Sequence, residues 1–455
     1  MENLAVVILA AGQGTRMKSK LPKVLHRVGD RSMLEHSYDR AKSLSADSIH
    51  IVYGHGGEQV KAMLGHLNCE WVLQAEQRGT GHAVEQAMPN IADDNMVLVL
   101  YGDVPLVRVE TLQKLIDSAK QSGFGLLTAN LADPTGYGRI VRDDKGNVVQ
   151  IVEQKDANPA ELTINEINTG MLAVQAGRLS KWISALDDNN AQGELYLTDI
   201  IEMAATSGVK INTVQPATID ETLGANNRVQ LAELERHLQQ RQAMDLMFAG
   251  VTLRDPLRFD LRGTLTAGSD VEIDINCLFQ GNVTLGNNVK IAANCVISNS
   301  TLADNVVVEA NSIIEDSTIA ESATIGPFGR LRPGTVLEEG AKIGNFVEVK
   351  KSTIGKGSKV SHLSYIGDTT MGADVNIGAG TITCNYDGAN KFKTIIEDGV
   401  FVGSDSQLVA PVTIAKGTTV GAGSTITKDT PADQLSLSRS KQVTISGWQR
   451  PVKNK

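Results

Sequence analysis

The C-terminal half of the chain repeats small or branched residues every six positions, and aliphatic residues such as Ile273 and Ile426 often follow two places later. A strand alternates with period two and an α-helix with period 3.6, so a sustained period of six fits neither alone. It is typical of a β-helix built from hexapeptide units. The repeating positions are Val271, Cys277, Val283, Val289, Cys295, Thr301, Ala323, Gly329, Thr335, Ala341, Val347, Thr353, Ser358, Ser364, Thr370, Val400, Ser406, Val412, Thr418 and Ser424.

Each hexapeptide would supply one flat strand and one corner, and three would close one triangular coil that stacks on its neighbours. The alternative is a β-sandwich, which also alternates. A sandwich shows turn signals every 8 to 12 residues or so and has no reason to keep one register this long. We therefore predict a left-handed parallel β-helix for residues 250–455, including a polar, basic tail.

The N-terminal half instead alternates short apolar runs with amphipathic segments. The runs at 6–9, 49–53 and 96–100 predict buried strands, and residues 33–43 and 109–122 predict helices between them. This order is typical of an α/β domain with a mostly parallel, Rossmann-like sheet, placed at 1–228. Residues 229–249 contain neither Gly nor Pro and predict a long helical linker.

Composition narrows the function classes. The net charge is −9, so the chain lacks the excess of basic residues expected of a protein that binds nucleic acid or an anionic membrane. Four scattered cysteines, Cys69, Cys277, Cys295 and Cys384, suggest neither a disulfide framework nor a zinc site. The apolar run at 4–11 follows no positive charge, and no run approaches 18 apolar residues, so we expect a cytoplasmic protein.

A glycine-containing loop, residues 10–17, follows the first predicted strand. Small residues at the carboxyl end of such a strand let the backbone approach a ligand closely, although a tight turn is the simpler alternative. The loop is neither a P-loop nor the GxGxxG dinucleotide motif. Asp103 follows the strand at 96–100, where a carboxylate can hold Mg²⁺, or can simply cap a helix.

The string LAAGQGTRM, followed by Leu21-Pro22-Lys23, resembles the sugar-nucleotide pyrophosphorylases. Further motifs match in order, among them QRGTG, YGD, GYGR and NTG. The resemblance implies that Arg16 and Lys23 face the transferred phosphoryl group and that Asp103 and Asn226 bind Mg²⁺. It implies nucleotide and sugar contacts at Leu9, Ala10, Ala11, Gly12, Lys23, Gln74, Gly79, Thr80, Tyr101, Gly102, Asp103, Gly138, Glu153, Asn168 and Asn226.

The predicted β-helix contains a single histidine, His362, and an excursion at 384–394 that interrupts the repeat. One histidine cannot form a three-histidine zinc site within a chain, and the alternative to a functional role is an ordinary surface residue. Excursions from solenoids often carry function. An imidazole is suited to take a proton from an amine near neutral pH.

The surroundings of His362 resemble hexapeptide acyltransferases, in which a histidine serves as general base. That resemblance implies a site for an amino-sugar phosphate at Arg332, Lys350, Tyr365 and Asn376, although Lys350 and Lys351 could equally form a solvated corner. It implies acetyl-CoA contacts at Ala379, Asn385, Tyr386, Ser404, Ala422 and Arg439.

Over its whole length the chain resembles the bacterial bifunctional N-acetylglucosamine-1-phosphate uridyltransferase and glucosamine-1-phosphate N-acetyltransferase family. GPFGRLRPG, GNFVEVKK and NIGAGTITCNYDGANKFKT carry this resemblance, while Gln13 departs from the lysine familiar at that place. It implies acetyl transfer from acetyl-CoA, then uridylyl transfer from UTP with Mg²⁺, in a homotrimer with acetyltransferase sites between subunits. The product, UDP-N-acetylglucosamine, would supply peptidoglycan and lipopolysaccharide synthesis.

Two alternatives remain open. The chain could be a single-activity sugar-1-phosphate nucleotidyltransferase whose β-helix only oligomerises, or a non-catalytic trimeric scaffold. The intact His362, the excursion and Arg439 favour two activities over the first. The complete phosphate loop and metal positions oppose the second.

Overall fold

The computed structural model describes residues 3–12, 14–54 and 57–453. The chain divides into two compact units, Met1–Leu238 and Gln239–Lys455. The division falls within one long helix, α7 (Arg228–Phe248), close to the helix predicted at 229–249. No helix in the described ranges has the length and apolar character needed to cross a membrane.

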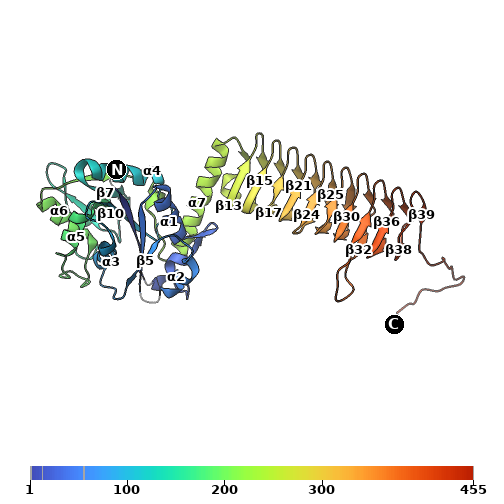
Figure 1. Ribbon diagram of the computed structural model, residues 1–455, viewed down its shortest axis with the longest axis horizontal. Coiled ribbons are helices and arrows are strands. Elements are labelled where there is room, and N and C mark those ends of the chain that lie inside the picture. Colours follow the sequence, from blue (N-terminus) through green and yellow to red (C-terminus); the bar gives the residue numbers. More distant parts are fainter. Residues whose placement is uncertain (1–2, 13, 55–56, 454–455) are drawn as a thin grey trace. The chain divides into compact units, whose positions relative to one another are not determined.

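The first unit is built on a mixed sheet in the order β11-β7-β10-β6-β1-β4-β5, to which β8 and β9 add a hairpin (Figure 1). Strands β1, β4, β5 and β6 run parallel, and β10 runs antiparallel to β6 and β7. The strands of this sheet are β1 (Leu4–Ala10), β4 (Ser48–Gly54), β5 (Glu70–Gln74), β6 (Met96–Tyr101), β7 (Gly123–Asn130), β8 (Arg139–Arg142), β9 (Val148–Val152), β10 (Glu166–Gln175) and β11 (Lys210–Val214), while β2 (Arg27–Val28) and β3 (Arg31–Ser32) pair with each other in a separate small sheet.

Helices cover both faces of this sheet because successive residues of β1 point to opposite sides. Val7 packs in the core formed with α3, α5 and α6, and Val6 and Ile8 pack in the core formed with α1 and α4. The helices are α1 (Met33–Ser43), α2 (Glu58–Leu64), α3 (Thr80–Ala87), α4 (Val109–Ser122), α5 (Ala176–Ile183) and α6 (Ile200–Thr206). The predicted helices at 33–43 and 109–122 are confirmed.

Local signals explain those two helix boundaries. The Ser32 side chain accepts a hydrogen bond from the backbone N–H of Glu35, whose carboxylate accepts from the Ser32 N–H, so a capping box begins α1. Helix α4 ends at Ser122 and is capped by Gly123, which adopts φ 95°. The predicted strands are also present, each longer by one to three residues.

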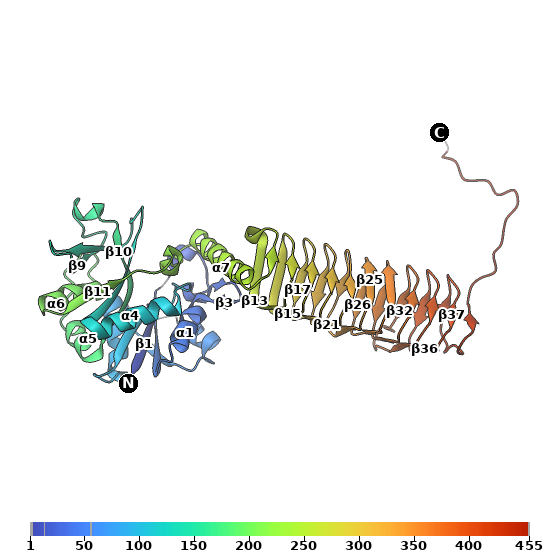
Figure 2. The same ribbon diagram turned by 90° about the horizontal axis from the view of Figure 1, so that it is seen from above.

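The second unit is a parallel β-helix, so the predicted fold class is confirmed (Figure 2). Its described strands form two sheets, one of which supplies a single face of the coil. That sheet has 11 strands: β12 (Thr252–Leu253), β14 (Glu272–Ile273), β16 (Lys290–Ile291), β19 (Val307–Val308), β22 (Thr324–Ile325), β25 (Lys342–Asn345), β28 (Lys359–His362), β31 (Asn376–Ile377), β34 (Phe401–Val402), β37 (Thr419–Val420) and β39 (Leu435–Ser436).

The other two faces are joined in a second sheet. Its strands are β13 (Phe259–Ala267), β15 (Cys277–Leu285), β17 (Val296–Ser298), β18 (Thr301–Leu302), β20 (Ile313–Glu315), β21 (Ser317–Ile319), β23 (Arg330–Leu331), β24 (Thr335–Leu337), β26 (Glu348–Lys350), β27 (Thr353–Ile354), β29 (Tyr365–Gly367), β30 (Thr369–Met371), β32 (Ile382–Cys384), β33 (Thr394–Ile396), β35 (Gln407–Val409), β36 (Val412–Ile414) and β38 (Thr425–Ile426).

The inward positions depart from the predicted six-residue repeat at three places. Ser300, Ser352 and Thr369 are buried, whereas Thr301 and Thr370 are exposed and Thr353 is half-buried. One corner therefore takes five residues in these coils. Their hydroxyls remain satisfied, as Ser352 Oγ donates to the Lys350 carbonyl at 2.8 Å. The repeat is correct for the fold and wrong by one residue at this corner.

Candidate functional site

The loop predicted to bind a nucleotide leaves the carboxyl end of β1 and continues into a short 3₁₀ helix at Thr15–Met17. Gly14 adopts φ 63°, and a Cβ on it would lie 2.6 Å from the Lys23 Cβ. Both the backbone conformation and the close approach therefore require glycine here. Gln13, whose role was in question, lies outside the described residues.

A cavity of ≈ 320 Å³ opens beside this loop. It unites ten of the predicted contacts with residues that were not predicted, notably Gln77 and Glu194. Gln77 Nε2 donates to the Ala11 carbonyl, and its place as the first residue of the QRGTG motif was the signal that could have found it. The predicted residues in the lining are Leu9, Ala10, Ala11, Gly12, Lys23, Gln74, Gly79, Thr80, Tyr101 and Asp103.

Gln74 lies almost fully buried in this cavity and presents one defined polar group to it. Its Nε2 lies 3.0 Å from the Gly79 carbonyl oxygen and 3.2 Å from His82 Nδ1. Both amide hydrogens are therefore used when Nδ1 of the imidazole acts as the acceptor. The carbonyl oxygen of Gln74 is left to accept a hydrogen bond from a ligand.

Lys23 connects the two residues that the sequence assigns to a metal. Its Nζ lies 2.5 Å from Asp103 Oδ2 and 3.1 Å from Asn226 Oδ1. The Lys23 and Asp103 side chains are only 13% and 16% exposed. Nowhere in the described ranges do three or more His, Cys, Asp or Glu residues gather into a metal site. Because Mg²⁺ commonly takes one or two carboxylates and completes its shell with water and phosphate, one carboxylate beside one amide oxygen fits it.

The residues predicted to hold the sugar, Gly138, Glu153 and Asn168, lie close to one another. The Asn168 N–H donates to the Gly138 carbonyl at 2.9 Å, and a Cβ on Gly138 would lie 3.2 Å from Glu153 Oε1. Thr198 Oγ1 donates to that same Glu153 oxygen at 3.2 Å. Burial raises the pKa of Glu153 above its ordinary value.

Two further predicted residues lie outside the cavity lining and belong neither to the group around Lys23 nor to the residues predicted to hold the sugar. Arg16 is exposed on the 3₁₀ helix, and Gly102 donates its N–H to the Leu9 carbonyl at 2.9 Å. Gly102 therefore supports the loop through backbone contact. Arg16 would have to reach the phosphates from outside.

A second cavity, of ≈ 710 Å³, was not predicted. It is lined in part by Glu153, Asp156, Asp187, Asp199 and Glu202. Burial and then the Asp187 and Glu153 carboxylates raise the pKa of Asp199 to about 6. Like charges crowd this cavity, so an ionised Asp199 opposes folding.

In the β-helix, His362 belongs to a column of residues that we call the His362 edge: His362, Ala379, Ser404 and Ala422. Backbone hydrogen bonds join successive coils there, from Gly380 N to His362 O and from Asp405 N to Ala379 O. A Cβ on Gly423 would lie 3.7 Å from Arg439 Cδ, which places Arg439 at the end of the column. The structure thus brings four predicted acetyl-CoA contacts to the edge that carries His362.

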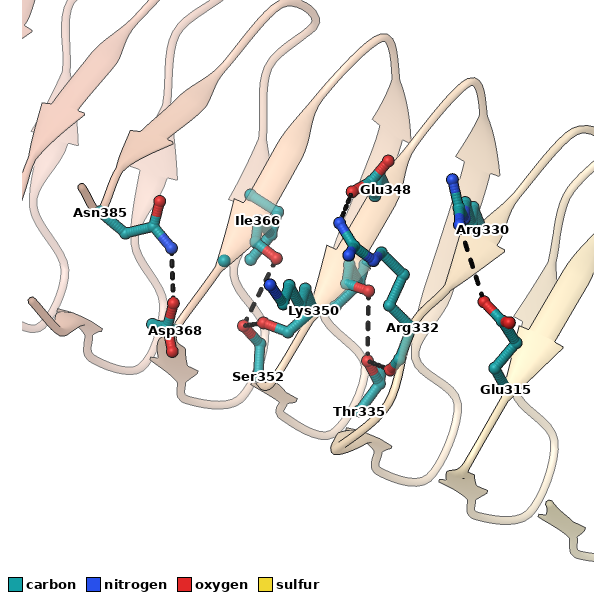
Figure 3. A network of polar contacts seen from close by, with 12 residues as sticks. Glu315, Arg330, Arg332, Thr335, Glu348, Lys350, Ser352, Ile366, Asp368 and Asn385 are labelled. Atoms are coloured by element: carbon teal, nitrogen blue, oxygen red, sulfur yellow. Dashed lines mark hydrogen bonds and ion pairs between the residues drawn. The ribbon is translucent and has the colours of Figure 1, made fainter. Parts of the chain in front are cut away.

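A different corner forms the Lys350 edge, which consists of Arg332, Lys350, Asp368 and Asn385 (Figure 3). The Arg332 guanidinium pairs with Glu348 at 2.8 Å. The neighbouring ammonium of Lys391, and then Arg332, lower the pKa of Lys350. Such a concentration of positive charge is suited to bind an anionic group.

The excursion joins this Lys350 edge. Thr369 in one coil pairs with Thr394 in the next, so the excursion is inserted between these two residues. The preceding pair on this face joins Thr353 to Thr370 without such an insertion. Asn385 Nδ2 donates to Asp368 Oδ2 at 2.5 Å, and a Cβ on Gly367 would lie 2.4 Å from Tyr365 Oη. Tyr386, in the excursion, is exposed and donates to the Gly388 carbonyl at 2.6 Å.

The predicted acetyltransferase residues therefore fall into separate groups within one chain. His362 lies at the end of β28, Tyr365 lies on β29, and Lys350 is the last residue of β26, where it pairs with Gly367 at the opposite end of β29. Asn376 lies on β31, in the 11-stranded sheet. One chain alone does not gather His362, Asn376 and the Lys350 edge into a single site.

Comparisons with known proteins find different families in the two units. Residues 6–189 match the family profile of the MobA-like NTP transferase domain. Residues 261–343 match the GMPPB C-terminal domain, and residues 393–428 match six bacterial transferase hexapeptide repeats. A solved UDP-glucose pyrophosphorylase in complex with UDP-glucose is 16% identical with a TM-score of 0.44, over 53% of this chain and 100% of that one.

The matches to the NTP transferase and hexapeptide profiles define the class of protein. The N-terminal unit contains a nucleotidyltransferase-type domain, and the C-terminal unit is a hexapeptide-repeat β-helix of transferase type.

Proposed function

We propose that the protein makes UDP-N-acetylglucosamine in two reactions. The β-helix would transfer an acetyl group from acetyl-CoA to glucosamine 1-phosphate. The N-terminal unit would then join N-acetylglucosamine 1-phosphate to UTP and release pyrophosphate. The observation that carries the choice of nucleotide is the orientation of Gln74.

Gln74 offers an acceptor oxygen inside the cavity because its amide nitrogen is used by Gly79 and His82. Uracil carries an N–H on its pairing edge and can donate to that oxygen. Adenine and cytosine present an acceptor nitrogen at the corresponding ring position, which would be repelled. Guanine also carries an N–H at that position, so the amide orientation supports a uridine or guanosine nucleotide, and the resemblance to uridyltransferases favours uridine.

Uridylyl transfer is a displacement at the α-phosphorus. The oxygen of the sugar phosphate is already ionised and needs no general base, so the protein's task is to position it and neutralise charge. Lys23 and Arg16 would stabilise the negative charge on the reacting phosphates. Asp103 and Asn226 would hold Mg²⁺, which supplies further positive charge to the phosphates when bound.

Acetyl transfer would use the two edges of the β-helix. Arg332 and Lys350 would bind the phosphate of the amino sugar, and the His362 edge would bind acetyl-CoA. His362 would accept the proton lost by the amine as the C–N bond forms and the C–S bond breaks. The thiolate of coenzyme A then takes up a proton. A direct attack fits the raised thiol pKa of Cys384, which disfavours a nucleophilic thiolate.

A homotrimer would complete this site. Because His362 and Lys350 lie on different edges of one chain, a neighbouring chain can supply the second edge. Cyclic assemblies of three or more identical subunits bring two different surfaces together at every interface.

The deciding experiment is an assay of purified protein with glucosamine 1-phosphate, acetyl-CoA, UTP and Mg²⁺, in which each component is omitted in turn. We expect UDP-N-acetylglucosamine only in the complete mixture. Omission of acetyl-CoA should leave uridylyl transfer to added N-acetylglucosamine 1-phosphate intact. If that acceptor yields no UDP-sugar, the nucleotidyltransferase assignment is wrong; if no acetyl group is transferred, the β-helix has another role.

A further inference from the structure

Thr198 belongs to a short 3₁₀ helix, Leu197–Asp199, that is hydrogen bonded to both groups of predicted residues in the N-terminal unit. Thr198 Oγ1 donates to Glu153 Oε1 at 3.2 Å. The Leu197 N–H donates to Thr80 Oγ1 at 3.1 Å, and Thr80 lines the cavity of ≈ 320 Å³. One short helix therefore joins a residue predicted to contact the nucleotide to a residue predicted to hold the sugar.

Backbone hydrogen bonds fix the segment that leads into this helix. The Leu195 N–H donates to the Arg78 carbonyl at 2.7 Å, and the Leu195 carbonyl accepts from the Gly81 N–H at 2.8 Å. The chain approaches so closely here that a Cβ on Gly79 would lie 2.6 Å from the Leu195 oxygen. Thr198 is thus held on a fixed backbone, as a residue that orients another side chain must be.

Glu153 lies in surroundings that disfavour its charge. Burial raises its pKa, the hydrogen bond from Thr198 lowers it, and the Asp156 carboxylate raises it. The cavity of ≈ 710 Å³ that Glu153 lines has no Lys, Arg or His among its described residues. Thr198 is the one hydrogen-bond donor to this carboxylate in the described part of the chain. The titratable groups that interact with the Glu153 charge are Asp156, Asp199, Tyr101 and Tyr196.

We propose that Thr198 is a positioning residue that holds Glu153 as a hydrogen-bond acceptor for hydroxyl groups of the sugar phosphate. This inference rests on the proposed uridylyl transfer. An ionised carboxylate only accepts hydrogen bonds, and the hydroxyl groups of a sugar can donate them. Because carboxylates crowd the cavity that Glu153 lines, its potential repels a phosphate. The hydroxyl-bearing part of the sugar is therefore the part that Glu153 can bind.

Gly138 leaves room for this contact. A Cβ at that position would lie 3.2 Å from Glu153 Oε1, the same oxygen that accepts from Thr198. The Gly138 carbonyl also accepts from the Asn168 N–H, which places a second predicted sugar residue beside Glu153. Thr198 thus engages one carboxylate oxygen, and Glu153 Oε2 is the oxygen left for a ligand.

Two substitutions at position 198 separate the hydroxyl from the methyl group. Thr198→Val removes the hydroxyl at nearly constant volume, and Thr198→Ser keeps the hydroxyl without the methyl. We expect Thr198→Val to raise KM for N-acetylglucosamine 1-phosphate about tenfold and to leave KM for UTP unchanged. Thr198→Ser should stay within about threefold of wild type. Thr206→Val, in the lining of the ≈ 710 Å³ cavity, is the matched control and should change neither constant.

The pair of variants can also overturn the inference. Unchanged KM for the sugar phosphate in Thr198→Val would show that Glu153 does not depend on the hydroxyl. Equal impairment of Thr198→Val and Thr198→Ser would assign the effect to lost packing of the methyl group. A rise in KM for UTP as large as that for the sugar phosphate would assign it to displacement of the whole 3₁₀ helix.

Thermal unfolding tests the same contact without any substrate. Because the pKa of Glu153 is raised, the stability it contributes is present below pH ~4.5 and is lost as pH rises. Loss of the Thr198 donor raises this pKa further, so more stability is lost at neutral pH. We expect Thr198→Val to lower the unfolding temperature by about 2–4 °C at pH 7.5 and by less at pH 4, with Thr198→Ser unchanged at both.

The Glu153→Gln background shows whether the effect passes through the carboxylate. There the pH-dependent part of the Thr198→Val effect should disappear, since the titrating group is gone. An equal effect at both pH values in the wild-type background, or a pH-dependent one in the Glu153→Gln background, would overturn the inference. Absence of uridylyl transfer by the wild type, with the stability pattern intact, would instead overturn the proposed function and the sugar as the ligand, while the Thr198–Glu153 contact would stand.

Discussion

At the scale of single residues, Lys23 has two proposed roles that it cannot perform at the same time. Its ammonium lies between Asp103 and Asn226, the oxygens proposed to bind Mg²⁺. A metal at those oxygens must displace it, and the phosphates of UTP are the natural new partner for the ammonium. Lys23 would thus oppose metal binding before the nucleotide arrives and assist catalysis afterwards.

Replacement of Lys23 by Ala should separate these two effects. We expect nucleotide-free protein to bind Mn²⁺ roughly tenfold more tightly, because the competing cation is gone. Uridylyl transfer should fall by about two orders of magnitude. Electron paramagnetic resonance of free Mn²⁺ measures the first effect, with the exposed Lys20→Ala as control. Unchanged Mn²⁺ binding would show that the ammonium does not compete.

Asp199 gives the first unit a defined pH dependence. Its pKa is raised from 3.8 to about 6, so the folded state holds a proton that the unfolded state releases. Stability contributed by this group is present below pH ~4 and is lost as pH rises toward ~6. Asp199→Asn should therefore stabilise the protein at pH 7.5 by about 1 kcal/mol, a value reduced for its partial exposure. Thermal unfolding at pH 7.5 and pH 4 measures it, and equal gains at both values would contradict the assignment.

At the scale of elements, sequence periodicity predicts the fold well and fails where one corner shortens. Hydrophobic spacing identifies the strands and helices because burial imposes it directly. The five-residue step before Ser352 leaves no comparable signal, since Ser352 and Thr353 are both small polar residues. Only the coil geometry decides which of them turns inward.

Substitution of these two neighbours tests the corrected repeat. Ser352 Oγ accepts from the Thr369 N–H at 2.9 Å, so Ser352→Ala leaves that buried donor without its partner. We expect a loss of about 1–3 kcal/mol in local stability. The matched Thr353→Ala should cost less than about 0.5 kcal/mol. Hydrogen exchange of the Thr369 amide should accelerate in the first variant alone; acceleration in both would restore the original repeat.

At the scale of the molecule, motifs predict the grouping of the candidate nucleotide-site residues better than that of the proposed acetyltransferase residues. The contacts around Leu9, Gln74 and Asp103 come together because the carboxyl ends of neighbouring strands meet at one sheet edge. In the β-helix, residues near in sequence diverge to different corners, as His362 and Lys350 do. Whether a second chain completes a site there depends on the assembly, which the spacing of residues in one sequence does not determine.

Complementation between inactive variants tests that requirement. His362→Ala removes the base from one edge, and Lys350→Ala removes a cation from the other, so we expect each to lose acetyl transfer by about two orders of magnitude. In randomly mixed trimers with sites shared between neighbours, about a quarter of the interfaces would unite an intact His362 edge with an intact Lys350 edge. Mixed variants, unfolded and refolded together, should regain that fraction of activity, while separately refolded controls stay inactive. No recovery in verified mixed trimers would place both edges of each site in one chain, and recovery would show that two chains meet to form each site of the proposed acetyl transfer.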